Sequence, residues 1–109
     1  MAGAIARADI RLCALPRPDK RRPVVVLTRE SVIPYLSAVT VAPITSTIRG
    51  VASEVRLNES DGLKRPCAVN LHNVVTVPKD WLGRRVGVLS HERMEEICGA
   101  LGFALGCIS

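Results

Sequence analysis

The amino-acid sequence predicts a mainly β fold, a small barrel or tightly curled sheet followed by one C-terminal helix. Short apolar or alternating segments recur between residues 8 and 89, and turn-forming residues separate them. Helical spacing of apolar residues appears only after residue 90, which disfavours parallel βαβ units. A chain of 109 residues is expected to form one domain, with residues 1–6 as a frayed end.

Three strands are expected in the first half of the chain. Residues 8–14 alternate loosely between polar and apolar, as in a strand with one buried face. Residues 23–28 form a β-branched apolar run that is short enough for a buried strand. Between them, the three prolines of residues 15–23 preclude a helix, so this segment is a basic loop. The third strand is 38–44, where Pro43 indicates an edge or a bulge.

The second half continues with short strands before the helix. Alternation predicts a strand at 53–57, half open to solvent, and a loop follows at 58–66 with an Asp-Gly turn signal. Residues 67–71 and 73–77 are two further strand segments, and 85–89 is the last. The total is therefore six or seven strands.

The C-terminal helix is expected to begin after Ser90, a good N-cap, with Glu92 in its first turn. Seven apolar residues then share one helical face: Met94, Ile97, Cys98, Leu101, Ala104, Leu105 and Ile108. This face is expected to pack on the strands.

Composition narrows the class of protein. Aromatic residues make up only 3%, so the core must be built from aliphatic side chains. The net charge of +5 is concentrated in residues 1–30, where seven basic and three acidic residues give +4. Such a field attracts phosphate-bearing partners, although a solubilising surface explains it equally well. No apolar run approaches the ~20 residues of a membrane span.

The cysteines are expected to be reduced and buried in a cytoplasmic protein. Residues 1–15 lack the apolar run of a signal peptide, and no two cysteines have CxxC spacing. Nucleotide-binding, metalloprotease and hydrolase motifs are also missing, so the sequence predicts no metal and no cofactor. His72 is a candidate general base, but a histidine at a strand break is more often structural.

Two stretches contain residues suited to a phosphodiester. The first, residues 21–27, brings Arg22 into a rigid strand; the second, residues 42–47, ends a strand in a cluster of hydroxyls. A guanidinium donates in a planar fork to two phosphate oxygens, and a hydroxyl can donate to the same group. A surface arginine and an ordinary Ser/Thr-rich turn remain the simpler explanation from these residues alone.

These same stretches carry a family resemblance. Arg-Pro-Val-Val-Val-Leu-Thr at 22–28 and Val-Ala-Pro-Ile-Thr-Ser at 41–46 resemble the core of the MazF/PemK toxins. Residues 6–11 resemble the family's opening strand, Ser53-Glu54-Val55 its Phe-Glu-Val strand, and 67–77 its later strand pair. The resemblance covers about residues 7–107. No single motif is very specific, but their order and spacing together are.

The resemblance implies an SH3-like barrel of six or seven strands, closed by the C-terminal helix and paired as a homodimer. It implies the toxin of a toxin–antitoxin pair that cleaves single-stranded RNA, with mRNA as the usual target. The family's catalytic arginine and threonine fall on Arg22 and Thr45. Contacts to RNA are expected from six further residues: Arg17, Lys20, Arg21, Ser46, Arg49 and Asn73. An antitoxin with an acidic, disordered tail is the expected protein partner.

The sequence departs from the family at several positions. Ala8 replaces the usual glycine, Arg11 replaces the usual tryptophan or tyrosine, and the loop at 15–21 is short. Three alternatives stay open: a non-catalytic RNA- or peptide-binding module, a topoisomerase poison on the same fold, and a toxin that has lost activity. The C-terminal tail, residues 104–109, has no aromatic residue, which counts against the topoisomerase poison.

Overall fold

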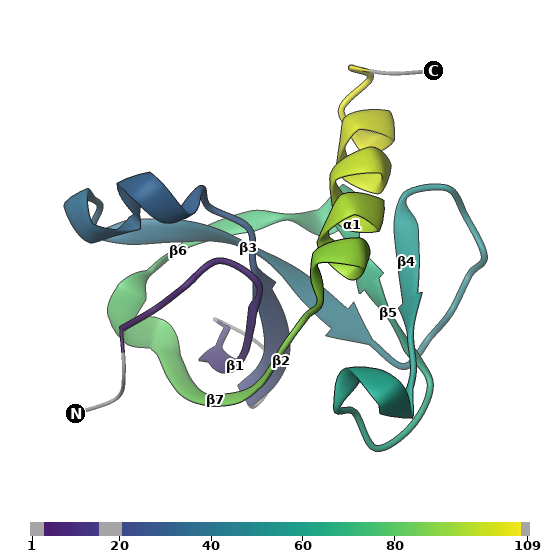
Figure 1. The fold of residues 1–109 in the computed structure, drawn as a ribbon, viewed down its shortest axis with the longest axis horizontal. Coiled ribbons are helices and arrows are strands. Elements are labelled where there is room, and N and C mark those ends of the chain that lie inside the picture. Colours follow the sequence, from purple (N-terminus) through teal and green to yellow (C-terminus); the bar gives the residue numbers. More distant parts are fainter. Residues whose placement is uncertain (1–3, 16–20, 108–109) are drawn as a thin grey trace.

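The computed structural model describes residues 4–15 and 21–107 (Figure 1). The strands are β1 (Asp9–Ala14), β2 (Arg21–Val26), β3 (Ala38–Thr45), β4 (Glu54–Leu57), β5 (Cys67–Asn70), β6 (Val75–Pro78) and β7 (Leu82–Val88). The one α-helix in this part of the chain, α1, is His91–Ala104. Four short 3-10 helices connect the strands: η1 (Glu30–Tyr35), η2 (Glu59–Asp61), η3 (Leu71–Asn73) and η4 (Lys79–Trp81). The predicted mainly β class, strand number and C-terminal helix are thus confirmed.

The strands form one curled antiparallel sheet. Its order is β4-β5-β3-β2-β1-β7, and β6 pairs with β3 outside this path. β3 therefore lies at the centre, since it pairs with β2, β5 and β6 along its length. Figure 1 shows β7 bending around β1. Among the described residues the ladder does not join β4 to β7, so the sheet is barrel-like but open at that seam.

β3 changes partner near its end, and two prolines explain where. β2 and β3 pair from Val26 to Val24, the last of which faces Pro43. Pro43 has no backbone N–H, and neither has Pro23, the next residue of β2, so neither can donate to the ladder. Beyond this point Ile44 and Thr45 pair with β5 instead. The prediction of an edge or a bulge at Pro43 was wrong, because β3 is the central strand and its register with β2 is regular up to Pro43.

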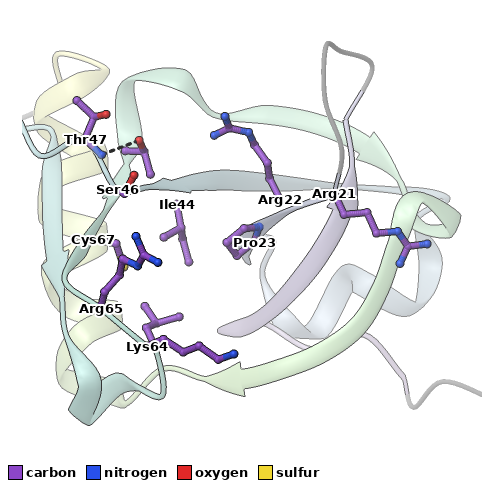
Figure 2. A pocket seen from close by; sticks show the side chains of 11 residues that line it. Arg21, Arg22, Pro23, Ile44, Ser46, Thr47, Lys64, Arg65 and Cys67 are labelled. Carbon is purple, nitrogen blue, oxygen red and sulfur yellow. Dashed lines mark hydrogen bonds between the residues drawn. The ribbon is translucent and has the colours of Figure 1, made fainter.

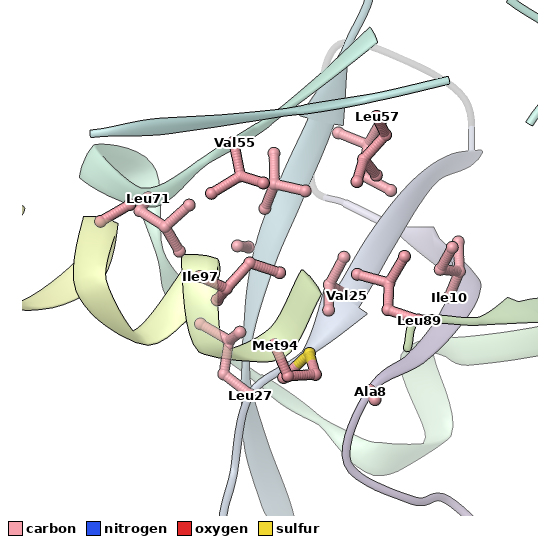
Figure 3. Close-up of a cluster of buried hydrophobic side chains, with 14 of the residues drawn as sticks. Ala8, Ile10, Val25, Leu27, Val55, Leu57, Leu71, Leu89, Met94 and Ile97 are labelled. Atoms are coloured by element: carbon pink, nitrogen blue, oxygen red, sulfur yellow. The ribbon is translucent and has the colours of Figure 1, made fainter. Parts of the chain in front are cut away.

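Two clusters of buried aliphatic side chains occupy the two sides of the sheet. The larger lies between the sheet and α1 (Figure 3) and includes Ile10, Val25, Leu57, Val69 and Ile97. The smaller gathers Cys13, Val24, Val26, Ile33, Val39, Val41, Val77 and Leu82. Because β2 alternates, Val25 belongs to the first cluster and its two neighbours to the second. β2, which carries Arg21 and Arg22, is thus fixed from both sides.

α1 begins as predicted. The Ser90 Oγ accepts a hydrogen bond from the Arg93 backbone N–H, which caps the helix. Its buried residues are Met94, Ile97 and Ala100, while Leu101 and Ala104 are partly buried against the same cluster. The prediction was wrong for Cys98 and Leu105, which are exposed. The buried stripe is narrower than the apolar spacing indicated, because α1 turns only the side of Met94, Ile97 and Ala100 fully into the core.

The cysteine prediction also needs correction. All four thiols are free, but only Cys13 and Cys67 are buried, and Cys98 and Cys107 are exposed. Among the described residues no helix is long and apolar enough to cross a membrane.

Residues 4–6 are attached to the fold rather than frayed. The Ala6 N–H donates to the Asp9 carboxylate, and the Arg11 guanidinium donates to the Ala4 carbonyl. Asp9 and Arg11 are themselves a buried ion pair with an Nε–Oδ2 distance of 3.0 Å. Arg11, which replaces the family's usual tryptophan or tyrosine, therefore stabilises the fold through this ion pair and its bond to Ala4.

Candidate functional site

A cation-lined groove opens where β2 and β3 separate (Figure 2). Its volume is about 650 Å³. Its lining residues are Arg21, Arg22, Pro23, Ile44, Thr45, Ser46, Thr47, Leu63, Lys64, Arg65 and Cys67. Four of these are basic and none is acidic, so the groove is suited to an anionic ligand.

Arg22 of β2 and Thr45 of β3 lie just beyond the last pair of the β2–β3 ladder, and both line the groove. Val24 faces Pro43, and each step back along antiparallel β2 corresponds to one step forward along β3. Two steps beyond that pair therefore lie Arg22 and Thr45. Arg22 pairs with Cys13 of β1, and Thr45 pairs with Ala68 of β5. The backbone of each residue is therefore fixed by a neighbouring strand, although β2 and β3 no longer pair with each other here.

The chemistry of the two side chains is complementary at this point. Arg22 is exposed on β2, and its guanidinium extends over the groove in Figure 2. The Thr45 Oγ1 accepts a hydrogen bond of 3.1 Å from the Thr47 backbone N–H, which orients the hydroxyl. Because the oxygen accepts in that contact, its own O–H stays available to donate. Arg22 and Thr45 can thus donate to one anionic group.

A second, smaller hollow of about 230 Å³ adjoins the groove. It is lined by Arg22, Pro43, Thr45, Thr47, Arg49, Asn70 and Asn73. The Glu54 carboxylate accepts from the Arg49 and Gly50 backbone N–H groups and holds the turn that carries Arg49. The Asn70 Oδ1 accepts from the His72 backbone N–H, so its amide NH₂ remains to donate.

The structure brings together the described residues that the sequence nominated. Arg21, Arg22, Thr45 and Ser46 line the groove, and Arg49 and Asn73 line the adjoining hollow. Arg17 and Lys20 lie outside the described residues.

Two nominated side chains lie away from the centre of the site. The Arg21 guanidinium points away from the rest of the lining in Figure 2 and reaches Gly83 of β7, where a Cβ would lie 2.8 Å from its Nη1. His72 lines neither hollow; its Nδ1 shares a hydrogen bond with the Ser53 hydroxyl. Among the described lining residues there is accordingly no imidazole and no carboxylate.

Sequence reasoning missed Lys64 and Arg65. Both are on the 58–66 loop, which was predicted only as a loop with a turn signal, and both line the groove. The local sequence, a basic pair after an Asp-Gly turn, does not reveal which part of the fold these side chains face. Only the pairing of β3 with β5 brings the end of this loop beside Thr45. Asn70, on β5, was missed for the same reason, whereas Thr47 belongs to the hydroxyl cluster at 42–47 that the sequence singled out.

Cys67 lines the groove but is not suited to act as a nucleophile. Burial raises the pKa of its thiol, and the negative charge of Asp61 raises it further. Cys67 is therefore a neutral thiol at neutral pH, and the thiolate is the reactive form. Among the described residues no three His, Cys, Asp or Glu side chains gather to hold a metal ion.

The chain is similar to known proteins along most of its length. The model of the family "PemK-like, MazF-like toxin of type II toxin-antitoxin system" matches residues 6–105. "Endoribonuclease MazF3" of Mycobacterium tuberculosis is 46% identical over 86 residues, which are 79% of this chain and 84% of that protein.

Two solved structures are also similar. The "Mycobacterium tuberculosis toxin MazF-mt6" superposes with a TM-score of 0.83 at 43% identity, covering 90% of this chain and 96% of that one. A mycobacterial "endoribonuclease in complex with its cognate antitoxin" gives a TM-score of 0.87 at 27% identity, covering 97% and 99%. The chain belongs to the PemK-like, MazF-like family of toxins of type II toxin–antitoxin systems.

Proposed function

We propose that this toxin is an endoribonuclease whose groove binds single-stranded RNA and places the scissile phosphate between Arg22 and Thr45. The observation that carries the proposal is that Arg22 and Thr45, each two residues beyond the last β2–β3 pair, line one groove. Among the described residues that line this groove none is acidic. The similarity to a protein named as an endoribonuclease supports the same activity.

RNA carries its own nucleophile, so the protein has mainly to position and stabilise. The 2′-oxygen attacks the adjacent phosphorus while its proton is lost, and the bond from phosphorus to the 5′-oxygen breaks as that oxygen is protonated. The products are a 2′,3′-cyclic phosphate and a 5′-OH end. The Arg22 guanidinium stabilises the charge on the phosphorane, and Thr45 donates a hydrogen bond to the same phosphate.

The rest of the lining divides into two kinds of contact. Arg21 and Arg49 would contact flanking phosphates, and so would Arg17 and Lys20, which the sequence nominated. The Ser46 hydroxyl and the Asn73 amide would form hydrogen bonds with the edges of bases that are splayed into the hollows. With few aromatic residues in the chain, hydrogen bonding rather than stacking supplies base selectivity.

The protein partner proposed here is an antitoxin with an acidic tail that lies over the same groove. A similar mycobacterial structure is a complex with its cognate antitoxin, and the cationic groove complements such a tail. A homodimer is supported by exposed apolar side chains around η1, β6 and η4, namely Val32, Tyr35, Leu36, Val75 and Trp81. A cytoplasmic location follows from the proposed substrate, mRNA.

The first experiment is cleavage of a long single-stranded RNA in the presence of EDTA, with mapping of the ends. We expect discrete cuts with 5′-OH ends. Arg22→Ala and Thr45→Ala should each lower the rate by about a hundredfold or more, since each removes a donor to the transition state. Arg56→Ala is the matched control, because Arg56 is exposed on β4 and does not line either hollow.

Two further substrates make this experiment decisive. An all-DNA analogue should bind without being cut, because it lacks the 2′-OH nucleophile. Cleavage of that DNA would contradict the mechanism. An RNA that shifts on a gel but stays intact with the wild type would instead favour a binding module.

A further inference from the structure

We propose that the loop between β4 and β5, residues 58–66, forms a second phosphate-binding wall of the groove. In this proposal Lys64 and Arg65 hold an RNA phosphate next to the one being cut, and the ion pair between Asp61 and Arg93 ties that wall to α1. Asp61 and Arg93 are then positioning residues, since they act through the loop. The inference rests on the proposed function and names further groups for the same site.

Lys64 and Arg65 are held between two anchors. Leu63 is partly buried against the larger core cluster, and Cys67 is buried at the start of β5, where it pairs with Leu57. Only three residues separate these anchors, and Pro66 restricts the backbone of Arg65 to extended conformations. In Figure 2 the Lys64 side chain extends from the loop into the space below Pro23, and the Arg65 side chain extends towards Ile44. They therefore form the wall that faces β2 across the groove.

These two cations are available for a ligand. Within the described part of the chain, neither the Lys64 nor the Arg65 side chain makes a hydrogen bond or an ion pair, and both are exposed. Arg93, by contrast, contacts both Asp61 and Glu96. A phosphate oxygen is a suitable acceptor for both, because a guanidinium binds it with a fork and an ammonium as a point charge.

The position of the loop is set by an ion pair with two hydrogen bonds. The Arg93 Nε and Nη2 donate to the two carboxylate oxygens of Asp61 at 3.0 and 3.1 Å. Asp61 also accepts from the Asn58 backbone N–H, which closes a capping box around η2. Arg93 is in the first turn of α1, and α1 is packed on the core through Met94 and Ile97. The helix thus fixes where the loop leaves the sheet.

The chain then turns from this anchor towards the groove at Gly62. Gly62 has φ +92°, a left-handed conformation that favours glycine. Asp61 is therefore followed by the turn residue Gly62, the partly buried Leu63 and then the two cations. A substitution at Asp61 or Arg93 would therefore displace Lys64 and Arg65, although neither Asp61 nor Arg93 contacts RNA in this proposal.

The first test measures binding of a fully 2′-O-methylated RNA, which cannot be cut, over a range of salt concentrations. The double variant Lys64→Ala, Arg65→Ala should lower the slope of log affinity against log salt by about 0.7, because the two cations hold one phosphate and each single-strand phosphate contact contributes ~0.7. In cleavage assays KM should rise roughly tenfold while kcat changes by less than about threefold. An unchanged slope and KM would overturn the proposal.

The second test separates positioning from stability. Asp61→Asn and Arg93→Gln should each raise KM at a temperature well below their melting temperatures, and Arg93→Lys should restore only part of the loss because it lacks the fork. Glu96→Gln is the matched control, since it removes the exposed partner of Arg93 and leaves Asp61 in place. A lower melting temperature with wild-type KM and salt slope would overturn the role of the ion pair.

These results can be told apart from failure of the proposed function. If the wild type cuts RNA and the loop variants match it in KM and salt slope, only the inference about the loop is overturned. If the wild type does not cut RNA, the proposed function is overturned, and the binding measurement with 2′-O-methylated RNA still decides whether the loop contacts phosphate.

Discussion

The two walls of the groove are built in different ways. The β2–β3 wall carries Arg22 and Thr45 on strands that are paired on their outer sides and backed by two clusters of buried side chains. The loop wall carries Lys64 and Arg65 on three residues between anchors, and an ion pair to α1 holds it. The first wall is rigid in the way that transition-state stabilisation requires, whereas the second supplies charge.

This difference bears on what each wall can contribute. A donor that stabilises developing charge must be placed within a few tenths of an ångström, and paired strands achieve that. A cation that holds a neighbouring phosphate tolerates more movement, because attraction between charges falls off slowly with distance. We therefore expect the strand wall to determine kcat and the loop wall to determine KM and its dependence on salt.

The largest expected effect comes from replacing arginine by lysine on each wall. Arg22→Lys keeps the charge but loses the planar fork, so kcat should fall roughly a hundredfold. Arg65→Lys should change KM by less than about threefold, because charge alone suffices there. Steady-state cleavage of a short fluorescent RNA measures both. Equal losses of activity in Arg22→Lys and Arg65→Lys would contradict the proposed difference between the two walls.

A smaller effect is expected from pH on the anchor of the loop wall. Burial by itself would raise the pKa of the Asp61 carboxyl, but hydrogen bonds from Arg93 and the Asn58 N–H, together with the charge of Arg93, lower it. Asp61→Asn should cost about 2 kcal/mol of unfolding free energy at neutral pH, the value of a charge-assisted hydrogen bond. Denaturant unfolding measures this cost.

The sign of the pH dependence follows from the lowered pKa. The advantage of the wild type over Asp61→Asn is fully present above the unfolded pKa of about 4 and is lost as the pH falls through the lower, folded pKa. Glu59→Gln, on the same 3-10 helix but exposed, is the control. A difference between wild type and Asp61→Asn that stays constant into strong acid would show that the charge of Asp61 does not hold the loop.

The smallest effect is expected from two glycines. Gly62→Ala meets no neighbour within 4 Å but must adopt φ +92°, so it should destabilise the protein by about 1 kcal/mol and raise KM slightly. Gly99→Ala also meets open space, but it is in the middle of α1 and should stabilise by up to about 1 kcal/mol. Thermal unfolding of both variants checks the opposite signs. A stabilised Gly62→Ala would contradict the left-handed turn.

Several elements could be predicted from local patterns, and others could not. Ser90 begins α1 because an N-cap needs only its own side chain and the next turn. Strand starts shifted by two or three residues, as at Arg21 and Leu82, because strand ends depend on partners rather than on propensity. Cys98 was wrongly assigned to the buried face, since helical spacing does not reveal how much of a helix the sheet covers.

By itself, the sequence determined the mainly β class, the order of short strands, the aliphatic core and the nomination of Arg22 and Thr45. All of these depend on residues close together in the chain or on a resemblance in order and spacing. Only the tertiary structure decided that β3 leaves β2 at Pro43, and that Lys64 and Arg65 face the groove. The pair between Asp61 and Arg93 also joins positions 32 residues apart. Long-range pairing of this kind is set by how strands and helix pack together, and no local pattern encodes it.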